Sequence, residues 1–324
     1  MSTPSGPPDS SEATRDPHEA RRYGNIGNDA AQRQFGLLDC GAMDPGHAAV
    51  TSDLPGHAIP TDEPLVWHYG LMAERWGEFL TDAPEVSFFR EEIERHGQPV
   101  LDLACGAGRL LLPLLAAGVD IDGCDISPDM LSQCRKAAAA AGYDPALYVQ
   151  PMHALDLPRR YRTIYICDSF GLAGSRENDL ETLRRCHDHL EIGGALVVGI
   201  DAEYTTRDSW DQWLPEERRA LPEAWPDDVP RRVAADGSEH IARFRSVAVD
   251  PLEQTYTREV RLEKWESGSL VASEEYQLRG NMYLKNEVVL MLRVAGFHEI
   301  SVRGDYTEEP ATADHDKLIF KAIR

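Results

Sequence analysis

Between residues 65 and 200, short apolar runs alternate with stretches in which apolar residues recur every three or four positions. An apolar run bounded by turn residues predicts a buried strand, and the three-to-four spacing predicts a helix. The expected strands are residues 100–103, 119–124, 146–150, 163–167 and 195–200. The expected helices are residues 65–80, 87–97, 109–117, 127–142 and 177–190. Such alternation produces a parallel sheet covered on both faces, so the expected fold class is α/β.

The pattern changes after Asp201. Residues 201–230 are acidic and carry several aromatic side chains, and residues 240–280 alternate with period two, which predicts an antiparallel β-meander. From residue 281 the sequence returns to a helix, ending at Gly296, and two closing strands. We therefore expect one domain made of residues 63–200 and 281–324, interrupted by an inserted lid and meander over residues 201–280. We expect the insert to contact substrate and a second copy of the chain.

Residues 1–62 are rich in proline and glycine and poor in bulky apolar residues. Such a segment cannot bury enough surface to offset the entropy lost on ordering, so we expect a flexible tail. It has no apolar stretch typical of a secretory signal, and no apolar run in the chain approaches the ~20 residues of a membrane-spanning helix. Six cysteines without a C-x-x-C pair indicate reduced thiols and a cytoplasmic location.

The charge of the chain limits the partners that it can bind. Lys and Arg number 33 against 55 Asp and Glu, a formal net charge of −22. A negative field of this size disfavours nucleic acid and anionic membranes, so we expect neither as a partner. The His, Cys and Asp residues show no metal-ligand spacing, so we predict no metal.

The segment with the clearest chemistry is DLACGAGRL, residues 102–110. A turn of small residues after a buried strand lets a ligand approach the backbone, and the next helix offers free N–H groups. Asp125, at the tip of the second strand, is placed to accept hydrogen bonds from ribose hydroxyls. The dinucleotide pattern fails because Leu111 or Arg109 stands where Gly or Ala is needed, and the Walker pattern is absent. The first crossover unit is therefore predicted to bind a ribose-containing ligand other than NAD or FAD.

Residues 100–110, VLDLACGAGRL, closely resemble the first motif of class I S-adenosylmethionine-dependent methyltransferases. Similar resemblances extend to GCDISPDML, LYVQPMHALDLP, LEIGGALVV and the C-terminal AGFHEISVRGDY and DKLIFKAIR. The resemblance is to the small-molecule type that carries an inserted antiparallel β-meander. It implies a seven-stranded, mostly parallel Rossmann-like sheet with a reversed C-terminal strand, and S-adenosyl-L-methionine as cofactor.

The resemblance also implies roles for particular residues. Asp102 would orient the loop or take the cofactor's ammonium group, and Asp125 would hold the ribose. The remaining cofactor-binding candidates are Ala104, Gly106 and Gly108 around the methionine part, Ile126, Met152 and His153 around adenine, and Trp76 at the methyl-bearing end. Pro151 departs from the family pattern, in which an acidic residue often binds the adenine amine, because proline has neither N–H nor carboxylate.

Asp168, which follows the fourth expected strand, and Tyr69 are the catalytic candidates. Asp168 could steer a cationic amine or accept a proton, and Tyr69 would cap the methyl-bearing end beside Trp76. No His–Asp pair or Lys stands out as a base for a hydroxyl acceptor, which favours N- or S-methylation of an amine, amino-acid or amino-sugar type of small molecule. An O-methyltransferase and a non-catalytic S-adenosylmethionine-binding module stay open, and a nicotinamide oxidoreductase ranks last. The exposed edges of the meander predict a homodimer.

Overall fold

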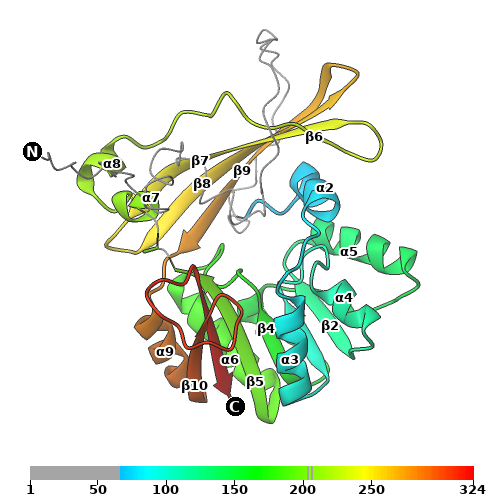
Figure 1. Cartoon of the computed structure of the whole chain (residues 1–324), viewed down its shortest axis with the longest axis vertical. Coiled ribbons are helices and arrows are strands. Elements are labelled where there is room, and N and C mark those ends of the chain that lie inside the picture. The colour runs from blue at the N-terminus through cyan, green and yellow to red at the C-terminus, as the bar shows by residue number, and fades with distance from the viewer. Residues whose placement is uncertain (1–65, 203, 206) are drawn as a thin grey trace, which may run out of the picture.

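The computed structural model describes residues 66–324 except residues 203 and 206, so the predicted tail lies outside the described residues. Figure 1 shows a large sheet flanked by helices, with a second, smaller sheet beyond one end of it and α2 (Gly70–Phe79) between the two. This arrangement places the elements of the expected meander outside the helix-covered sheet.

The large sheet has the strand order β10-β11-β5-β4-β1-β2-β3. Its parallel members are β1 (Val100–Leu103), β2 (Ile121–Asp125), β3 (Leu147–Val149), β4 (Tyr161–Ile166) and β5 (Leu190–Asp201). The C-terminal strand β11 (Lys317–Ile323) runs antiparallel to both of its neighbours, β5 and β10 (His298–Gly304). The predicted seven-stranded α/β sheet with a reversed C-terminal strand is confirmed.

Helices cover both faces of this sheet because alternate strand residues point to opposite sides. Tyr165 packs with residues of α3 (Val86–His96), α4 (Leu111–Ala116) and α5 (Pro128–Ala140). Its neighbours Ile164 and Ile166 pack with residues of α6 (Arg176–His189) and α9 (Lys285–Val294) on the other face. The buried strands therefore read as continuous apolar runs in the sequence, as observed.

Strand β5 differs from its prediction. It begins at Leu190, so the pair Gly193–Gly194, expected to close a helix, lies inside the strand. The register against β4 shifts between Tyr161, opposite Leu190, and Thr163, opposite Ala195. A Cβ on Gly194 would lie 2.9 Å from the Glu191 carbonyl oxygen. The two glycines therefore accommodate an irregularity within the strand.

The second sheet is antiparallel, with the order β6-β7-β8-β9. Its strands are β6 (Arg232–Val233), β7 (Glu239–Asp250), β8 (Thr255–Glu266) and β9 (Ser269–Asn281). The predicted antiparallel meander is confirmed, and the two-residue β6 extends it beyond the predicted start. Two short helices precede it, α7 (Arg207–Asp211) and α8 (Pro215–Arg219).

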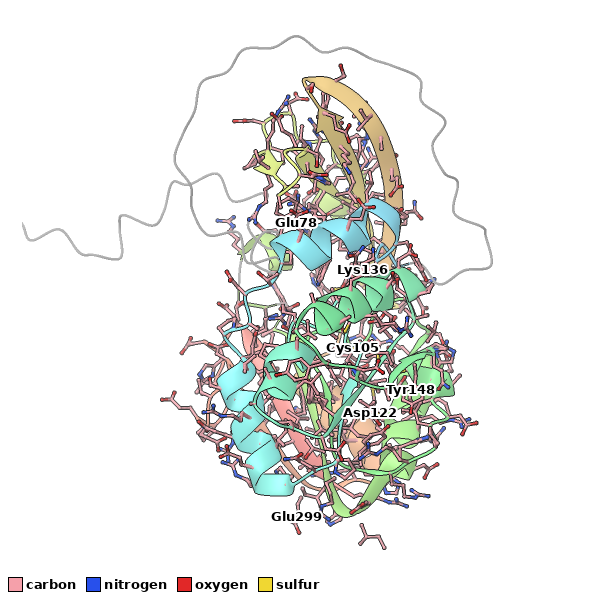
Figure 2. The ribbon with its side chains drawn as sticks, turned by 90° about the vertical axis from the view of Figure 1, so that its right-hand side faces the viewer. Glu78, Cys105, Asp122, Lys136, Tyr148 and Glu299 are labelled. Atoms are coloured by element: carbon pink, nitrogen blue, oxygen red, sulfur yellow. The ribbon has the colours of Figure 1, made fainter. Side chains whose placement is uncertain are left out.

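Helix α2 joins the two sheets. Its apolar side, with Leu71 and Met72, packs on Val260 and Leu262 of the meander. Its first amides are held from both sides, because Gly70 N donates to Asp129 Oδ2 of α5 at 2.9 Å and Leu71 N donates to Glu274 Oε2 of β9 at 2.7 Å. Carboxylates at a helix N-terminus stabilise it through its free N–H groups and its dipole. Figure 2 shows α2 lying between α5 and the meander.

Candidate functional site

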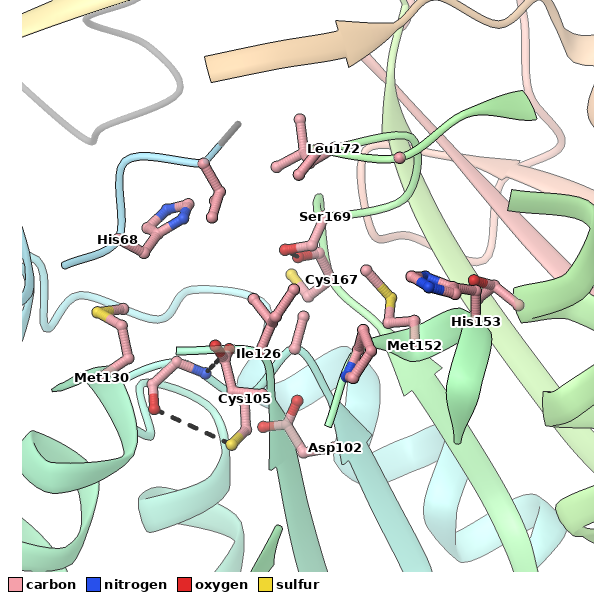
Figure 3. Close-up of a pocket in the computed structure, with 18 of the residues that line it drawn as sticks. His68, Asp102, Cys105, Ile126, Met130, Met152, His153, Cys167, Ser169 and Leu172 are labelled. Carbon is pink, nitrogen blue, oxygen red and sulfur yellow. Dashed lines mark hydrogen bonds between the residues drawn. The ribbon is translucent and has the colours of Figure 1, made fainter. Parts of the chain in front are cut away.

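A pocket of about 1070 Å³, counting its open mouth, lies at the carboxyl ends of β1, β2 and β4. The chain leaves β1 on one side toward β2 and returns on the other side as β4, and ligands of open α/β sheets bind at such a switch point. Figure 3 shows Asp102 and Cys105 at the floor and His68 and Leu172 on the far side. The pocket is therefore bounded both by the large sheet and by the segment that leads into α2.

The loop after β1 is held in conformations that favour small residues. Ala104, Gly106 and Gly108 have φ values of 69°, 53° and 90°, in the left-handed region. Ala104 and Gly106 line the pocket, whereas Gly108 lies against α5, where a Cβ would come within 2.8 Å of Cys134 Sγ. The first two residues thus leave the backbone open to a ligand, and the third allows close packing of the loop.

Asp125 ties this loop to the tip of β2. Gly106 N donates to its Oδ2 and Ser127 N donates to its Oδ1, both at 2.8 Å. Desolvation by burial raises the pKa of Asp125, and the hydrogen bonds from Ser127 and Gly106 oppose that rise. Each carboxylate oxygen retains capacity for a second hydrogen bond, so the side chain can hold the loop and also accept hydrogen bonds from a ligand in the pocket.

Asp102 lies at the floor of the pocket with one oxygen unsatisfied. The residue is 2 % exposed, and its Oδ2 makes no well-formed hydrogen bond within the described part of the chain; the nearby Tyr165 hydroxyl lowers the pKa of the carboxyl without satisfying this oxygen. Burial raises the pKa of this carboxyl to about 7. A buried carboxylate oxygen without a partner is costly, and a cationic ligand would relieve that cost. An ammonium group therefore fits this end of the pocket.

Four further predicted residues meet at the pocket, namely Trp76, Ile126, Met152 and His153. They come from α2, the loop after β2, and the short 3-10 helix η2 (Met152–Ala154). Pro151 lines the pocket beside them. Together with Asp102, Ala104, Gly106 and Asp125, they place eight of the nine predicted cofactor-binding residues on one cavity.

The two predicted catalytic residues do not line this pocket. Tyr69 precedes α2, where its carbonyl accepts from Met72 N at 3.0 Å, and its side chain packs with the cluster between α2 and the meander. Asp168 accepts from Tyr306 OH at 2.6 Å and lies 3.1 Å from Lys317 Nζ. Asp168 thus faces a neighbouring network, and a catalytic role for either residue stays a prediction.

Several lining residues were not selected from the sequence, and two of them, His68 and Asp179, carry polar groups that bear on the chemistry of the pocket. The His68 ring meets the Trp76 ring edge to face at 4.8 Å, and burial lowers the pKa of His68 to about 4. The imidazole is therefore neutral at pH 7. Its position between two aromatic residues, Trp67 and Tyr69, was the available signal in the sequence.

Tertiary structure brings Glu85, Cys167 and Asp168 together, with potential ligand atoms within 4.8 Å of one another. Each is already engaged: Glu85 pairs with Arg109 at 2.7 Å, and Tyr306 OH contacts both Cys167 and Asp168. The geometry is therefore accounted for by contacts within the protein.

The fold is that of class I methyltransferases, and comparisons with known proteins agree with it. A methyltransferase domain matches residues 100–194. YqeM of Bacillus subtilis (strain 168), a protein named as a methyltransferase, is 22% identical over 260 residues, covering 78% of this chain and 96% of that protein. The chain therefore contains a methyltransferase domain, and its fold is the one found in solved S-adenosylmethionine-dependent methyltransferases.

Solved structures share this fold. An S-adenosylmethionine-dependent methyltransferase from Clostridium acetobutylicum has a TM-score of 0.59 and 16% identity, covering 78% of this chain and 97% of that one. The sugar N-methyltransferase KedS8 from Streptoalloteichus has a TM-score of 0.58 and 19% identity, covering 88% of this chain and 99% of that one. Within the described part of the chain, no helix combines the length and apolar character needed to cross a membrane.

Proposed function

We propose that this protein transfers a methyl group to an amine nitrogen of a small molecule of amino-acid or amino-sugar type. The observation that carries the proposal is the charge of the pocket wall. Three acidic side chains line it, Asp102, Asp125 and Asp179, against one arginine, Arg109, whose charge is paired with Glu85 at 2.7 Å. Burial raises the pKa of each of the three, so a cation in the pocket would stabilise their ionised forms. Such a wall favours cationic ligands: the cofactor, with its sulfonium and ammonium groups, and an amine acceptor.

The lining residues fit the cofactor on physical grounds. The left-handed loop at Ala104 and Gly106 admits a ligand against the backbone, and Asp102 offers an unsatisfied oxygen to an ammonium group. Asp125 would accept from the ribose hydroxyls, and Ile126 would pack on the adenine. When bound, the cofactor supplies a methyl group already activated by the positive sulfur.

The protein's remaining task is to position a neutral amine in line with that methyl group and to exclude water. His68 and Leu172 line the pocket away from Asp102, and the Trp76 ring, which also lines the pocket, packs against His68. The neutral His68 imidazole can accept an N–H hydrogen bond and orient the nitrogen lone pair, while the apolar neighbours exclude water. A neutral amine needs no stronger base, whereas a hydroxyl acceptor would need its proton removed in the reaction.

Two solved structures with this fold support the acceptor class. KedS8 is a sugar N-methyltransferase, and CalS10, from Micromonospora echinaspora, is an amino pentose methyltransferase with the cofactor bound. The likeness concerns the fold, so the acceptor of this chain rests on its own pocket.

The test is methyl transfer from labelled S-adenosylmethionine to matched panels of amines, thioethers and phenols, with heat-denatured protein as the blank. We expect transfer to amines and a drop of at least tenfold in the variant His68→Leu, with cofactor affinity retained. Transfer to phenols alone would support an O-methyltransferase instead. Cofactor binding without transfer to any panel would support a binding module.

We also propose that the meander mediates a homodimer. Strand β9 is an edge of the smaller sheet, and near its start Val271 is 47% exposed. An exposed edge strand invites pairing with another chain. Size-exclusion chromatography with light scattering should give twice the chain mass, and a monomer mass at micromolar concentration would contradict the proposal.

A further inference from the structure

A buried carboxylate lies in the wall of the pocket at the first turn of α6. Asp179 is 5% exposed and lines the pocket. Its Oδ2 accepts from Asn281 Nδ2 and from Tyr283 OH, both at 2.6 Å. Its Oδ1 makes no hydrogen bond with any described residue. Oδ1 is not among the fully buried polar atoms, so it is open to the pocket and can accept a hydrogen bond from a ligand there.

The surroundings fix the orientation of this side chain. The Arg176 guanidinium lies 4.6 Å from the centre of the Tyr283 ring and donates to the Met282 carbonyl at 2.8 Å, which holds Tyr283 in place. Oδ1 lies beside Gly174, another lining residue, where a Cβ would come within 3.3 Å of it. The absence of a side chain at residue 174 therefore leaves this oxygen room for a ligand.

The charge state of Asp179 is compatible with acting as an acceptor. The pKa of Asp179 is raised, because desolvation by burial outweighs the hydrogen bonds from Tyr283 and Asn281 and the nearby Arg176 charge, which lower it. A carboxyl oxygen accepts a hydrogen bond in either protonation state, and a donor from a ligand would further favour the carboxylate.

We propose that Asp179 recognises an amino group of the ligand, with Oδ1 accepting its N–H. The inference rests on the proposed use of this pocket for the cofactor and an amine acceptor. Two amino groups qualify, the exocyclic amine of the cofactor's adenine and the amine of the acceptor. Helix α6 packs against η2, and the adjoining Pro151 can offer neither an N–H nor a carboxylate. That neighbourhood favours the adenine amine.

Calorimetric binding of two ligands to the purified full chain separates these cases. S-adenosylhomocysteine carries the amine, and S-inosylhomocysteine carries a carbonyl oxygen in its place, which a carboxylate would repel. We expect the wild type to prefer the adenine ligand by about tenfold or more, the range of one hydrogen bond to a charged group. Asp179→Asn should abolish or invert this preference because its amide can donate to the carbonyl.

Asp188→Asn is the matched control, since Asp188 lies on the same helix with its side chain 70% exposed. Gly174→Ala provides a second variant that keeps the carboxylate but crowds Oδ1, and it should weaken binding of the adenine ligand several-fold. Together the two variants keep the test decisive if Asp179→Asn fails to fold.

If Asp179 instead binds the amine of the acceptor, both variants will keep the preference for S-adenosylhomocysteine over S-inosylhomocysteine. In that case KM for the amine will rise about tenfold while the affinity for the cofactor stays unchanged. Unchanged ligand preference together with unchanged KM would overturn the inference. Failure of the wild type to bind S-adenosylhomocysteine would contradict the cofactor assignment itself, which is a different outcome from an unaltered preference.

Discussion

The link between Asp125 and the loop after β1 can be tested with Asp125→Asn, which preserves the shape of the side chain. The carboxylate accepts from Gly106 N and Ser127 N, both at 2.8 Å, at a position only 8% exposed. Hydrogen bonds to a charged group contribute about 1.5–3 kcal/mol each. The asparagine oxygen can keep one of them, but its amide group turns an N–H toward the other donor.

The expected loss is one charged hydrogen bond, partly offset because the variant no longer buries a charge. We therefore expect the free energy of unfolding to fall by about 1–2 kcal/mol, which lowers Tm by roughly 2–4 °C in a chain of this size. Affinity for S-adenosylhomocysteine should fall by about tenfold or more, because the ribose acceptor weakens and the loop loosens together.

Urea unfolding, thermal unfolding and calorimetry on the same preparation measure these three quantities. Asp144→Asn serves as the control because Asp144 is exposed, in the loop that follows α5. The reasoning would be refuted if Asp125→Asn matched the wild type in both Tm and ligand affinity. A loss of stability with unchanged affinity for S-adenosylhomocysteine would show that Asp125 stabilises the loop but does not bind the ligand.

Three further predictions concern Asp102 at the floor of the pocket, His68 on its far side, and the Tyr306 hydroxyl that donates to Asp168. Burial raises the pKa of Asp102 to about 7, so the folded state keeps its proton to higher pH than the unfolded state, and stability should fall from about pH 4 to pH 7 relative to Asp102→Asn. Urea unfolding of the wild type and of Asp102→Asn across that pH range measures this change. A difference in the free energy of unfolding that stays constant with pH would contradict the prediction. Burial lowers the pKa of His68 to about 4, so its imidazole NMR signals should not titrate between pH 5.5 and 8; a midpoint near 6.5 would show that the ring is solvated. Finally, a Cβ on Gly199 would lie 2.2 Å from Tyr306 OH, so Gly199→Ala should displace that hydroxyl and cost about 2–4 kcal/mol. A double-mutant cycle with Tyr306→Phe should recover part of this loss, and strict additivity would argue against the clash.

Much of the fold was predictable because it depends on short stretches of sequence. The apolar run 100–103, the small residues that follow it and the cap at Ser127 each specify local structure, and Ser127 Oγ indeed accepts from Met130 N at 3.1 Å. The alternation of such units restricts a chain to few sheet topologies. The double glycine at residues 193–194 misled the prediction, because a glycine pair is equally compatible with a turn and with an irregular strand.

The residues of the site likewise fall into those that the sequence predicted and those that only the tertiary structure placed. Sequence alone determined the residues on the loop after β1 and at the tip of β2, because their positions follow from consecutive elements. Only the tertiary structure decided that Asp168 faces Tyr306 and Lys317, and that His68 and Asp179 reach the pocket. These contacts join segments more than a hundred residues apart or elements from different layers. Their geometry depends on how α2, α6 and the meander pack, and no local pattern of residues encodes that packing.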